Sequence, residues 1–425
     1  MTKDERISDK VEKLKPSPSA CSTEANQDSD DSLSGTSEPG TPGTPSEPPV
    51  EAEAKSYVGF SGAMLWSFHM TIFMSCIVFT ALVLSFRWVL SFFMSGSLAT
   101  KKLHRPKARL NWEKLVKAED PVKLAREKLP VPPPFPEPEE EDFTITFGPC
   151  ANLMIYTGGV ACCLRRCPNY AEIAPKIRFY GNSCGAFVAS VMAADLDMLE
   201  FLPEMLSWTE RFHGRLWGLV GAYSASITAI VWKIFSRPEC FEAARERLTI
   251  GVTTFSPWPG RLAVTGFDSA KELVSSLLGS CYIPIAFEEP QWSEKHGPLW
   301  DGGIFDFASQ GNVVVSPYHL SFPDVGPATE YPRSFSFFPP HEADAVSLFE
   351  DGYMDCLRWL QNGAPSRRQE REEVSSAESS KHGWAQIAPL LREGKNFFAE
   401  LLQGCDRTDP RYAPSALPED HKKSL

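Results

Sequence analysis

The sequence predicts an α/β domain over residues 143–363, an open sheet of mainly parallel strands covered by helices. Two consecutive strand-turn-helix units carry this prediction. "DFTITFG" alternates like a strand before the helical "LMIYTGGVACCLRR", and the strand "IRFY" precedes the apolar helix "GAFVASVMAADL". Successive units of this kind are typical of a parallel sheet with helices on its faces. Further strands are expected at "RLTIGVTTF" and "RLAVTGF", and a further helix at "AKELVSSLLGSC".

The segments that flank this domain are polar. Residues 1–55 are rich in Ser, Pro and acidic residues, and they hold too few large apolar side chains to offset the entropy of ordering, so we expect a disordered tail. A charged, Pro-rich start is also unlike a secretory signal peptide. Residues 101–142 read as a basic and Pro-rich linker with a short helix, broken near Pro121. We expect a polar linker at 364–382 and a flexible tail at 405–425.

Residues 56–100 are expected to contain a membrane segment. Arg87 is the only formally charged residue in this stretch, and the apolar part runs from Ala63 to Phe86. About 20 apolar residues are enough to cross a bilayer as a helix. Basic residues between Lys101 and Arg109 follow the segment, so the positive-inside bias places the folded domain in the cytosol. The length fits either a single span or a hairpin with both ends cytosolic.

Charge and cysteine spacing exclude other classes of function. The net charge of -12 argues against a nucleic-acid partner, because phosphate binding needs a concentrated basic surface. Eleven cysteines are present, but no Cys-x-x-Cys pair and no His-rich tract accompany them, so we expect no metal site. No phosphate-cradling loop appears, and we expect no cofactor. Most cysteines are expected to be small core residues in a reducing compartment.

Residues 383–404 are predicted to form an amphipathic helix. Its apolar stripe has roughly helical spacing and contains Trp384, Ile387, Leu391, Phe398 and Leu402. Such a stripe either packs back on the domain or docks on a membrane or lipid surface.

The stretch "IRFYGNSCGAF" places Ser183 in a Gly-x-Ser-x-Gly turn between a strand and a helix. A serine hydroxyl is a weak nucleophile that needs a base and donors for the oxyanion that forms when it attacks an ester. Gly181 and Gly185 leave room for a strained elbow, and the positive end of the following helix favours developing negative charge. The alternative is an ordinary turn serine, but the position between strand and helix favours a nucleophile.

Asp301 in "LWDGG" is the candidate base. Gly302 and Gly303 behind it let the backbone approach a pocket closely, and a carboxylate held against a serine hydroxyl can act as general base without histidine. Two alternatives remain open on the residues alone. Asp-Gly-Gly is also a common turn sequence. The order Ser183, Asp301, His319 also fits a hydrolase triad.

At these residues the chain resembles a known family. Ser183 in "GNSCG" and Asp301 in "DGG" look like the Ser-Asp dyad of patatin-like phospholipases. "GGVACCLRR", "FDSAKELVSSLLGSCYIPI" and "FFPPHEADAVSLFEDGYMDCLRWLQNG" are similar to segments of the branch that contains adipose triglyceride lipase and adiponutrin. The resemblance covers 143–363. It implies an open α/β sheet with the dyad at its top, and acyl-ester hydrolysis or transfer on glycerolipids at membrane or lipid-droplet surfaces. The implied location is the endoplasmic reticulum, lipid droplets or both.

One departure from the family lies at the first strand-to-helix turn. The family has Gly-x-Gly-x-x-Gly there, whose backbone N-H groups stabilise the oxyanion, whereas this chain has "PCANLM", with Pro149, Ala151 and Met154 at the glycine positions. Proline has no N-H to donate. The backbone donors are then expected from Cys150, Ala151 and Asn152, and from Cys184 after the nucleophile. Losing one such donor costs about 10² to 10³ in rate.

Two functional hypotheses from different classes follow. The first is a membrane-anchored serine acyl hydrolase or transacylase of the triacylglycerol lipase or phospholipase type. The second is a catalytically weak or inactive scaffold that binds lipid surfaces and regulates another lipase, with an unidentified protein co-regulator. Failure of Ser183 to react with a fluorophosphonate, together with intact membrane targeting, would favour the scaffold. Activity restored by Pro149→Gly with Ala151→Gly would show that only the loop had drifted. The membrane segment argues against a third class, a soluble esterase.

Overall fold

The structure is a computed structural model that describes residues 109–138, 140, 142–212, 223–254, 260–283, 287, 291–304, 311–328, 331, 334–337 and 340–372. The predicted tails 1–55 and 405–425, the membrane segment 56–100 and the amphipathic helix 383–404 lie outside these residues. Within the described ranges, no helix has the length and hydropathy needed to cross a membrane.

A seven-stranded mixed sheet forms the centre of the domain, in the order β5-β6-β3-β2-β1-β7, with β4 also paired to β3. The parallel strands are β1 (Phe143–Phe147), β2 (Ile177–Asn182), β3 (Leu248–Thr254) and β7 (Val313–Val315). The other three, β4 (Gly260–Val264), β5 (Gln291–Ser293) and β6 (Gly297–Trp300), join β3 or each other antiparallel. The predicted α/β class is confirmed, and the antiparallel end of the sheet is a feature that the strand patterns did not indicate.

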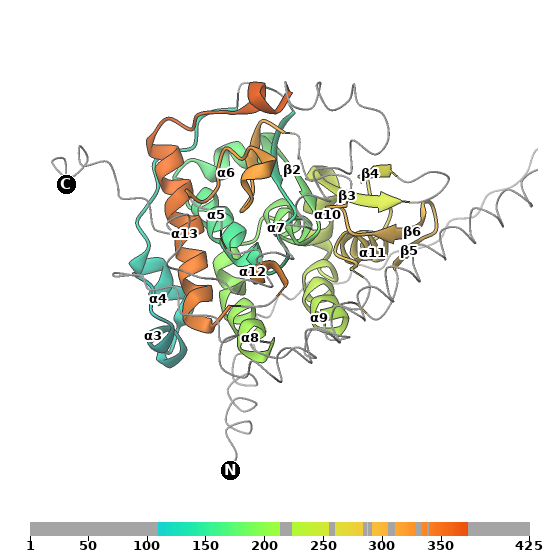
Figure 1. Ribbon diagram of the computed structural model, residues 1–425. Coiled ribbons are helices and arrows are strands. Elements are labelled where there is room, and N and C mark those ends of the chain that lie inside the picture. The colour runs from blue at the N-terminus through green and yellow to red at the C-terminus, as the bar shows by residue number, and fades with distance from the viewer. Residues whose placement is uncertain are drawn as a thin grey trace, which may run out of the picture. The chain divides into compact units, whose positions relative to one another are not determined.

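Helices cover this sheet (Figure 1). Helix α7 (Cys184–Ala193) contacts β1, β2 and β3, and α11 (Ala270–Ser280) contacts β3, β5 and β6. Helix α5 (Met154–Arg165) packs on α7 and lies along α13 (Glu342–Gln361). The remaining described α-helices are α3 (Trp112–Lys117), α4 (Pro121–Lys128), α6 (Tyr170–Ile173), α8 (Leu202–Phe212), α9 (Tyr223–Phe235), α10 (Pro238–Arg247) and α12 (Ser334–Phe337).

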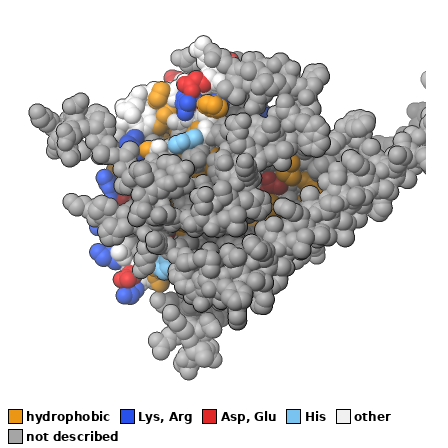
Figure 2. Space-filling model, in the orientation of Figure 1, with side chains coloured by type: hydrophobic (Ala, Val, Ile, Leu, Met, Phe, Trp, Pro, Cys, Tyr) orange, Lys and Arg blue, Asp and Glu red, His pale blue; other side chains and the backbone are white. Residues whose placement is uncertain are grey.

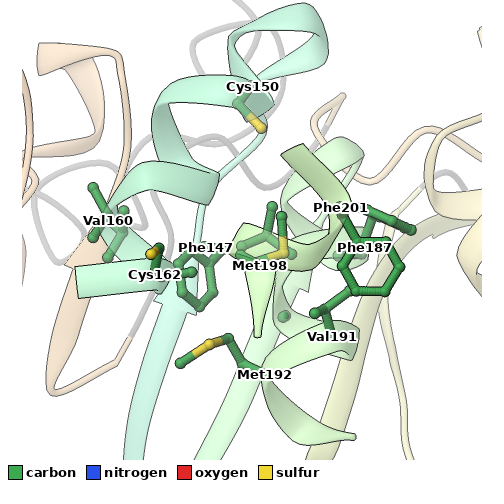
Figure 3. Packing of buried hydrophobic residues seen from close by; sticks show 14 of the residues in the cluster. Phe147, Cys150, Val160, Cys162, Phe187, Val191, Met192, Met198 and Phe201 are labelled. Atoms are coloured by element: carbon green, nitrogen blue, oxygen red, sulfur yellow. The ribbon is translucent and has the colours of Figure 1, made fainter. Parts of the chain in front are cut away.

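The core lies where α7 meets the sheet and where α5 packs on α7. Ile145, Phe147 and Thr146 of β1 are all fully buried, as expected for a central strand of a parallel sheet that is covered on both faces. Around α7, Phe147, Met192 and Met198 belong to one buried cluster, and Phe187 meets Phe201 edge to face with ring centroids 6.3 Å apart (Figure 3). Burial of almost every residue of α7 explains why this helix is apolar apart from Ser190 and its first residue, Cys184.

Helices α5 and α13 approach each other through glycines. A Cβ atom on Gly159 would lie 2.0 Å from the Phe349 carbonyl oxygen, and one on Gly352 would lie 1.9 Å from that of Tyr156. No side chain fits at either position, so the two backbones are in direct contact. Since α5 begins directly after the turn at 149–153, this contact also positions that turn.

The segment before β1 was predicted as a linker, but much of it packs on the domain. Asp120 caps α4 through a 2.8 Å bond from the Lys123 N-H, and Pro121 starts the helix, because a proline is tolerated in the first helical turn. Leu115, Ala125 and Phe135 are buried in the same core as the sheet. These side chains therefore belong to the core, although their spacing along a polar segment gave no sign of what they would contact. Figure 2 shows Lys and Arg side chains on the surface over α3 and α4.

The start of the predicted polar linker 364–382 is also anchored. Arg371 forms a 2.8 Å ion pair with Asp324, whose side chain is fully buried, and it donates to the carbonyl oxygens of Phe322 and Gly311. Residues from 373 onward lie outside the described part of the chain.

Candidate active site

Ser183 stands at the turn between β2 and α7 with φ 52° and ψ -140°. A non-glycine residue adopts such torsions at a cost of order 1–3 kcal/mol, and only where its surroundings hold it. Here the Ser183 N-H donates to the Ser280 hydroxyl at 2.8 Å, and the Ser183 carbonyl accepts from the Ala186 N-H at 2.9 Å. The predicted strand-elbow-helix arrangement is therefore present, with a strained serine at its apex.

The two glycines of the motif serve close packing. A Cβ atom on Gly181 would lie 2.5 Å from the Ala186 Cα atom. One on Gly185 would lie 2.3 Å from the carbonyl oxygens of both Phe147 and Gly148. The glycines let α7 sit directly on β2 and β1, while the positive φ belongs to Ser183 itself.

Asp301 follows β6 and meets Ser183, which lies 118 residues earlier in the sequence. The Ser183 Oγ donates to its Oδ2 at 2.6 Å, and the two residues are only 4% and 8% exposed. Every other polar atom of Asp301 is also engaged. Oδ1 accepts from the Gly303 N-H at 2.8 Å, the Asp301 N-H donates to the Tyr282 carbonyl at 3.1 Å, and its carbonyl accepts from the Thr253 hydroxyl at 2.8 Å. The carboxylate is thus held in one orientation before any substrate arrives.

The glycines after Asp301 are also needed for close approach. A Cβ atom on Gly302 would lie 2.1 Å from the Gly251 carbonyl oxygen. One on Gly303 would lie 2.8 Å from the Cβ atom of Pro149 and 3.0 Å from the Asp301 Oδ1. The Pro149 turn therefore lies beside the Asp301 loop.

The alternative base, His319, is engaged elsewhere. Its Nε2 atom hydrogen-bonds with the Pro327 carbonyl at 2.6 Å. The Ser183 hydroxyl donates to the carboxylate of Asp301, so the geometry favours a Ser-Asp pair over the triad.

Burial sets the ionisation of this carboxyl. It raises the pKa of Asp301 to about 6, and the hydrogen bonds from Ser183 and Gly303 partly oppose the rise. Asp301 is then ionised at neutral pH, but a modest acidification protonates it. Burial likewise raises the pKa of the Cys150 thiol beside the site well above its usual range. The pKa of Cys281 is raised by its hydrogen bond with Cys184 and by burial, so Cys150 and Cys281 remain neutral thiols at neutral pH.

Catalysis by this pair is expected to decline in acid. Protonated Asp301 cannot accept the Ser183 proton, so the rate at about pH 5 should be about tenfold below its plateau near pH 8. The measurement is the initial rate of ester hydrolysis against pH at constant ionic strength.

Protonation of Asp301 in acid does not destabilise the fold, so it does not lower the measured rate by unfolding the protein. The raised pKa of this carboxyl means that its stabilising contribution is full below its unfolded value and is lost as pH rises through about 6. A pH profile that is flat between about pH 5 and 8 in folded protein would remove Asp301 from the base role.

The turn after β1 keeps a positive φ angle, which glycine adopts readily, although alanine stands at this position. Ala151 has φ 46°, and Ala151–Leu153 form a single 3-10 turn closed by the Leu153 N-H on the Cys150 carbonyl at 2.9 Å. The Asn152 side chain donates to the Ser336 carbonyl of α12 at 3.0 Å, which braces the turn. Cys184, as the first residue of α7, has no intrahelical acceptor for its N-H. The oxyanion role of Cys150, Ala151, Asn152 and Cys184 remains a prediction.

Sequence reasoning missed Ser280, Thr253 and Tyr282, which all contact the backbone of the dyad residues. None stands in a motif, and Ser280 reads simply as the end of the predicted helix "AKELVSSLLGSC". Among the residues that the structure describes, no group of three or more His, Cys, Asp or Glu side chains is placed to hold a metal ion.

Comparison with known proteins finds a family model and relatives that are similar to this chain. Residues 145–309, which include Ser183 and Asp301, match a family model described as Patatin-like phospholipase. The chain is 26% identical over 259 residues to patatin-like phospholipase domain-containing protein 2 of Bos taurus, covering 54% of this chain and 52% of that protein. The Homo sapiens protein of the same name is 25% identical over 259 residues, covering 54% and 51%. The chain thus spans about half the length of these relatives.

Among solved structures, VipD from Legionella pneumophila aligns with a TM-score of 0.27 and 15% identity. The alignment covers 42% of this chain and 49% of that one, a likeness too slight to bear on the fold.

Proposed function

We propose, from the premise that residues 145–309 belong to the patatin-like phospholipase family, that this chain is a serine acyl hydrolase or transacylase acting on glycerolipids. The family resemblance read from the sequence is confirmed by the match and by the distant homology to patatin-like phospholipase domain-containing protein 2. The observation that carries the proposal is the 2.6 Å hydrogen bond from the Ser183 Oγ to the Asp301 Oδ2.

The geometry supports a two-step mechanism. As the Ser183 Oγ attacks the ester carbonyl carbon, Asp301 takes its proton, and the carbonyl oxygen becomes an oxyanion. The backbone N-H groups of 150–152 and of Cys184 are proposed to stabilise this charge. Collapse of the intermediate breaks the acyl-oxygen bond, and the proton on Asp301 passes to the departing alcohol. In the second step, water (in hydrolysis) or a second alcohol (in transfer) attacks the acyl-enzyme while Asp301 takes its proton. The bond between the acyl group and the Ser183 Oγ then breaks, and Asp301 returns the proton to that oxygen, which restores the pair.

The anchoring of the enzyme is part of this proposal. The apolar segment 56–100, followed by basic residues, would hold the cytosolic domain at the endoplasmic reticulum or lipid-droplet surface, where water-insoluble substrates are found. Exposed lysines and arginines of α3 and α4 continue that basic character after the segment. Removing 56–100 should release the protein from membrane fractions, and full retention there would contradict the anchor.

Fluorophosphonate labelling of the full chain in membranes tests the catalytic proposal. The probe should modify the peptide that contains Ser183, as read by mass spectrometry, because a serine paired with an ionised carboxylate is an activated nucleophile. Ser183→Ala should abolish the label. Ser190→Ala is the matched control, since Ser190 is a buried serine of α7, the helix that follows Ser183, and its hydroxyl donates to the Phe187 carbonyl at 2.7 Å.

The same experiment tests the rival scaffold function, which Pro149 favours because it removes one backbone donor from the turn. No label on the wild-type protein, with membrane association intact, would support the scaffold and overturn the hydrolase.

A further inference from the structure

Ser280 contacts both Ser183 and the loop that carries Asp301. It is the last residue of α11 and is fully buried. Its Oγ accepts from the Ser183 N-H at 2.8 Å and donates to the Gly251 carbonyl of β3 at 2.6 Å. Its own carbonyl accepts from the Gly302 N-H at 2.9 Å. One residue therefore joins the nucleophile turn, the central sheet and the loop that carries the base.

The directions of these bonds are determined by the donors available. A hydroxyl has one proton and two lone pairs, and a carbonyl such as that of Gly251 can only accept. The Ser280 proton therefore goes to Gly251, which leaves the oxygen to accept from the Ser183 N-H. An unsatisfied buried N-H costs about 1–3 kcal/mol, and Ser183 already carries backbone strain. The Ser280 hydroxyl thus stabilises the turn at its least stable residue.

The base loop packs on the same point. A Cβ atom on Gly302 would lie 3.0 Å from the Ser280 Oγ, so the loop backbone is in van der Waals contact with this side chain. Two residues further along, the Tyr282 carbonyl accepts from the Asp301 N-H at 3.1 Å. The C-terminal end of α11 therefore holds the Asp301 loop through two backbone bonds, and it holds the Ser183 turn through one side-chain bond.

We propose that Ser280 is a positioning residue for the Ser183–Asp301 pair, holding the nucleophile turn and the base loop in one rigid frame so that Oγ and Oδ2 meet before substrate binds. The catalytic consequence rests on the proposed function, whereas the frame itself is a property of the fold. Ser280 does not touch the reacting atoms, and it acts through the backbone of Ser183 and Gly302.

Ser280→Ala tests this role against Ser276→Ala, a matched change at a buried serine one turn earlier on the same helix. Amide hydrogen exchange should accelerate in peptides covering 179–187 and 298–304 in Ser280→Ala only. Fluorophosphonate labelling per folded molecule should slow by about ten- to hundredfold, because a displacement near 1 Å costs up to about 10²-fold in rate. Ser276→Ala should match the wild type in both measurements.

Each outcome decides the proposal. Wild-type exchange in both peptides of Ser280→Ala overturns the frame. Lowered thermal stability with an unchanged labelling rate per folded molecule shows a merely structural serine and overturns the positioning role. If the wild-type protein does not label, the proposed function fails, and the exchange comparison still decides the frame.

A second variant serves if Ser280→Ala does not fold. Ser280→Cys keeps a weak donor and a weak acceptor at the same position, and its exchange and labelling rates should fall between those of Ser280→Ala and the wild type. Wild-type behaviour in both measurements would overturn the proposal.

Discussion

Ser183→Ala is expected to lower the rate of acyl-ester hydrolysis by about 10⁴-fold or more, because the acyl-enzyme cannot form without the hydroxyl. Alanine removes only the Oγ and its 2.6 Å bond to Asp301. The backbone N-H of the alanine that replaces Ser183 can still donate to the Ser280 hydroxyl. The assays are fatty-acid release from triacylglycerol and phospholipid emulsions and cleavage of a soluble ester by the full chain.

Asp301→Asn should cause a comparable loss, and the double variant should be no slower than the slower single one. Residues that act as one unit are strongly non-additive, because removing either member already stops the step that both share. Losses that multiply in the double variant would show that Ser183 and Asp301 act independently, and equal activity in Ser183→Ala would refute the assignment outright.

Unfolding is not expected to explain the loss in Asp301→Asn. The raised pKa of Asp301 shows that its ionised form is disfavoured in the fold, a cost of about 3 kcal/mol above pH 6 that a neutral asparagine avoids. The variant should therefore be at least as stable as the wild type at neutral pH, as measured by thermal unfolding. The advantage should vanish below about pH 4, where the wild-type carboxyl is protonated in both states.

Gly352→Ala is expected to destabilise the domain by about 3 kcal/mol or more, because its new methyl group would meet the Tyr156 carbonyl oxygen at 1.9 Å. The obstacle is backbone, which cannot rotate away, so α5 and α13 must separate. Gly159→Ala should behave alike, since its Cβ atom would meet the Phe349 carbonyl at 2.0 Å. Chemical denaturation of the full chain measures the change in the free energy of unfolding.

Gly158→Ala is the matched control, one residue away on the same helix. Its Cβ atom would meet the Cε atoms of Met198 at 3.1 Å and Met205 at 3.5 Å, which are the ends of flexible side chains. The methyl group can be accommodated there, and alanine favours the helix by about 1 kcal/mol over glycine, so the net change should stay within about 1 kcal/mol. Equal stability of Gly352→Ala and Gly158→Ala would show that the helix contact is looser than the structure indicates.

Several features of the site were predictable because they depend on local pattern. The alternation of "DFTITFG" and the apolar run of "GAFVASVMAADL" identified the first two strand-helix units, and Gly-x-Ser-x-Gly at their junction identified Ser183. The "DGG" sequence made Asp301 a candidate base, although on the residues alone an ordinary turn was an equally open interpretation. Torsion angles, periodicity and close backbone approach are properties of a few neighbouring residues, and each leaves its mark on their identities.

Other features depend on contacts between distant parts of the chain. The packing of 110–138 on the core could not be predicted from the sequence. Leu115 and Phe135 stand among polar residues, and they are buried only because distant parts of the chain pack against them. The antiparallel pairing of β4 with β3 could not be predicted either, since the side chains of a strand alternate in the same way whichever direction it runs.

By itself the sequence determined the α/β class, the elbow at Ser183 and the candidacy of Asp301. Only the tertiary structure decided that the two side chains meet at 2.6 Å, that His319 binds the Pro327 carbonyl instead, and that Ser280 ties the two loops together. The physical reason is that a hydrogen bond spanning 118 residues depends on how β2, β6 and α11 pack, and no local periodicity encodes that packing.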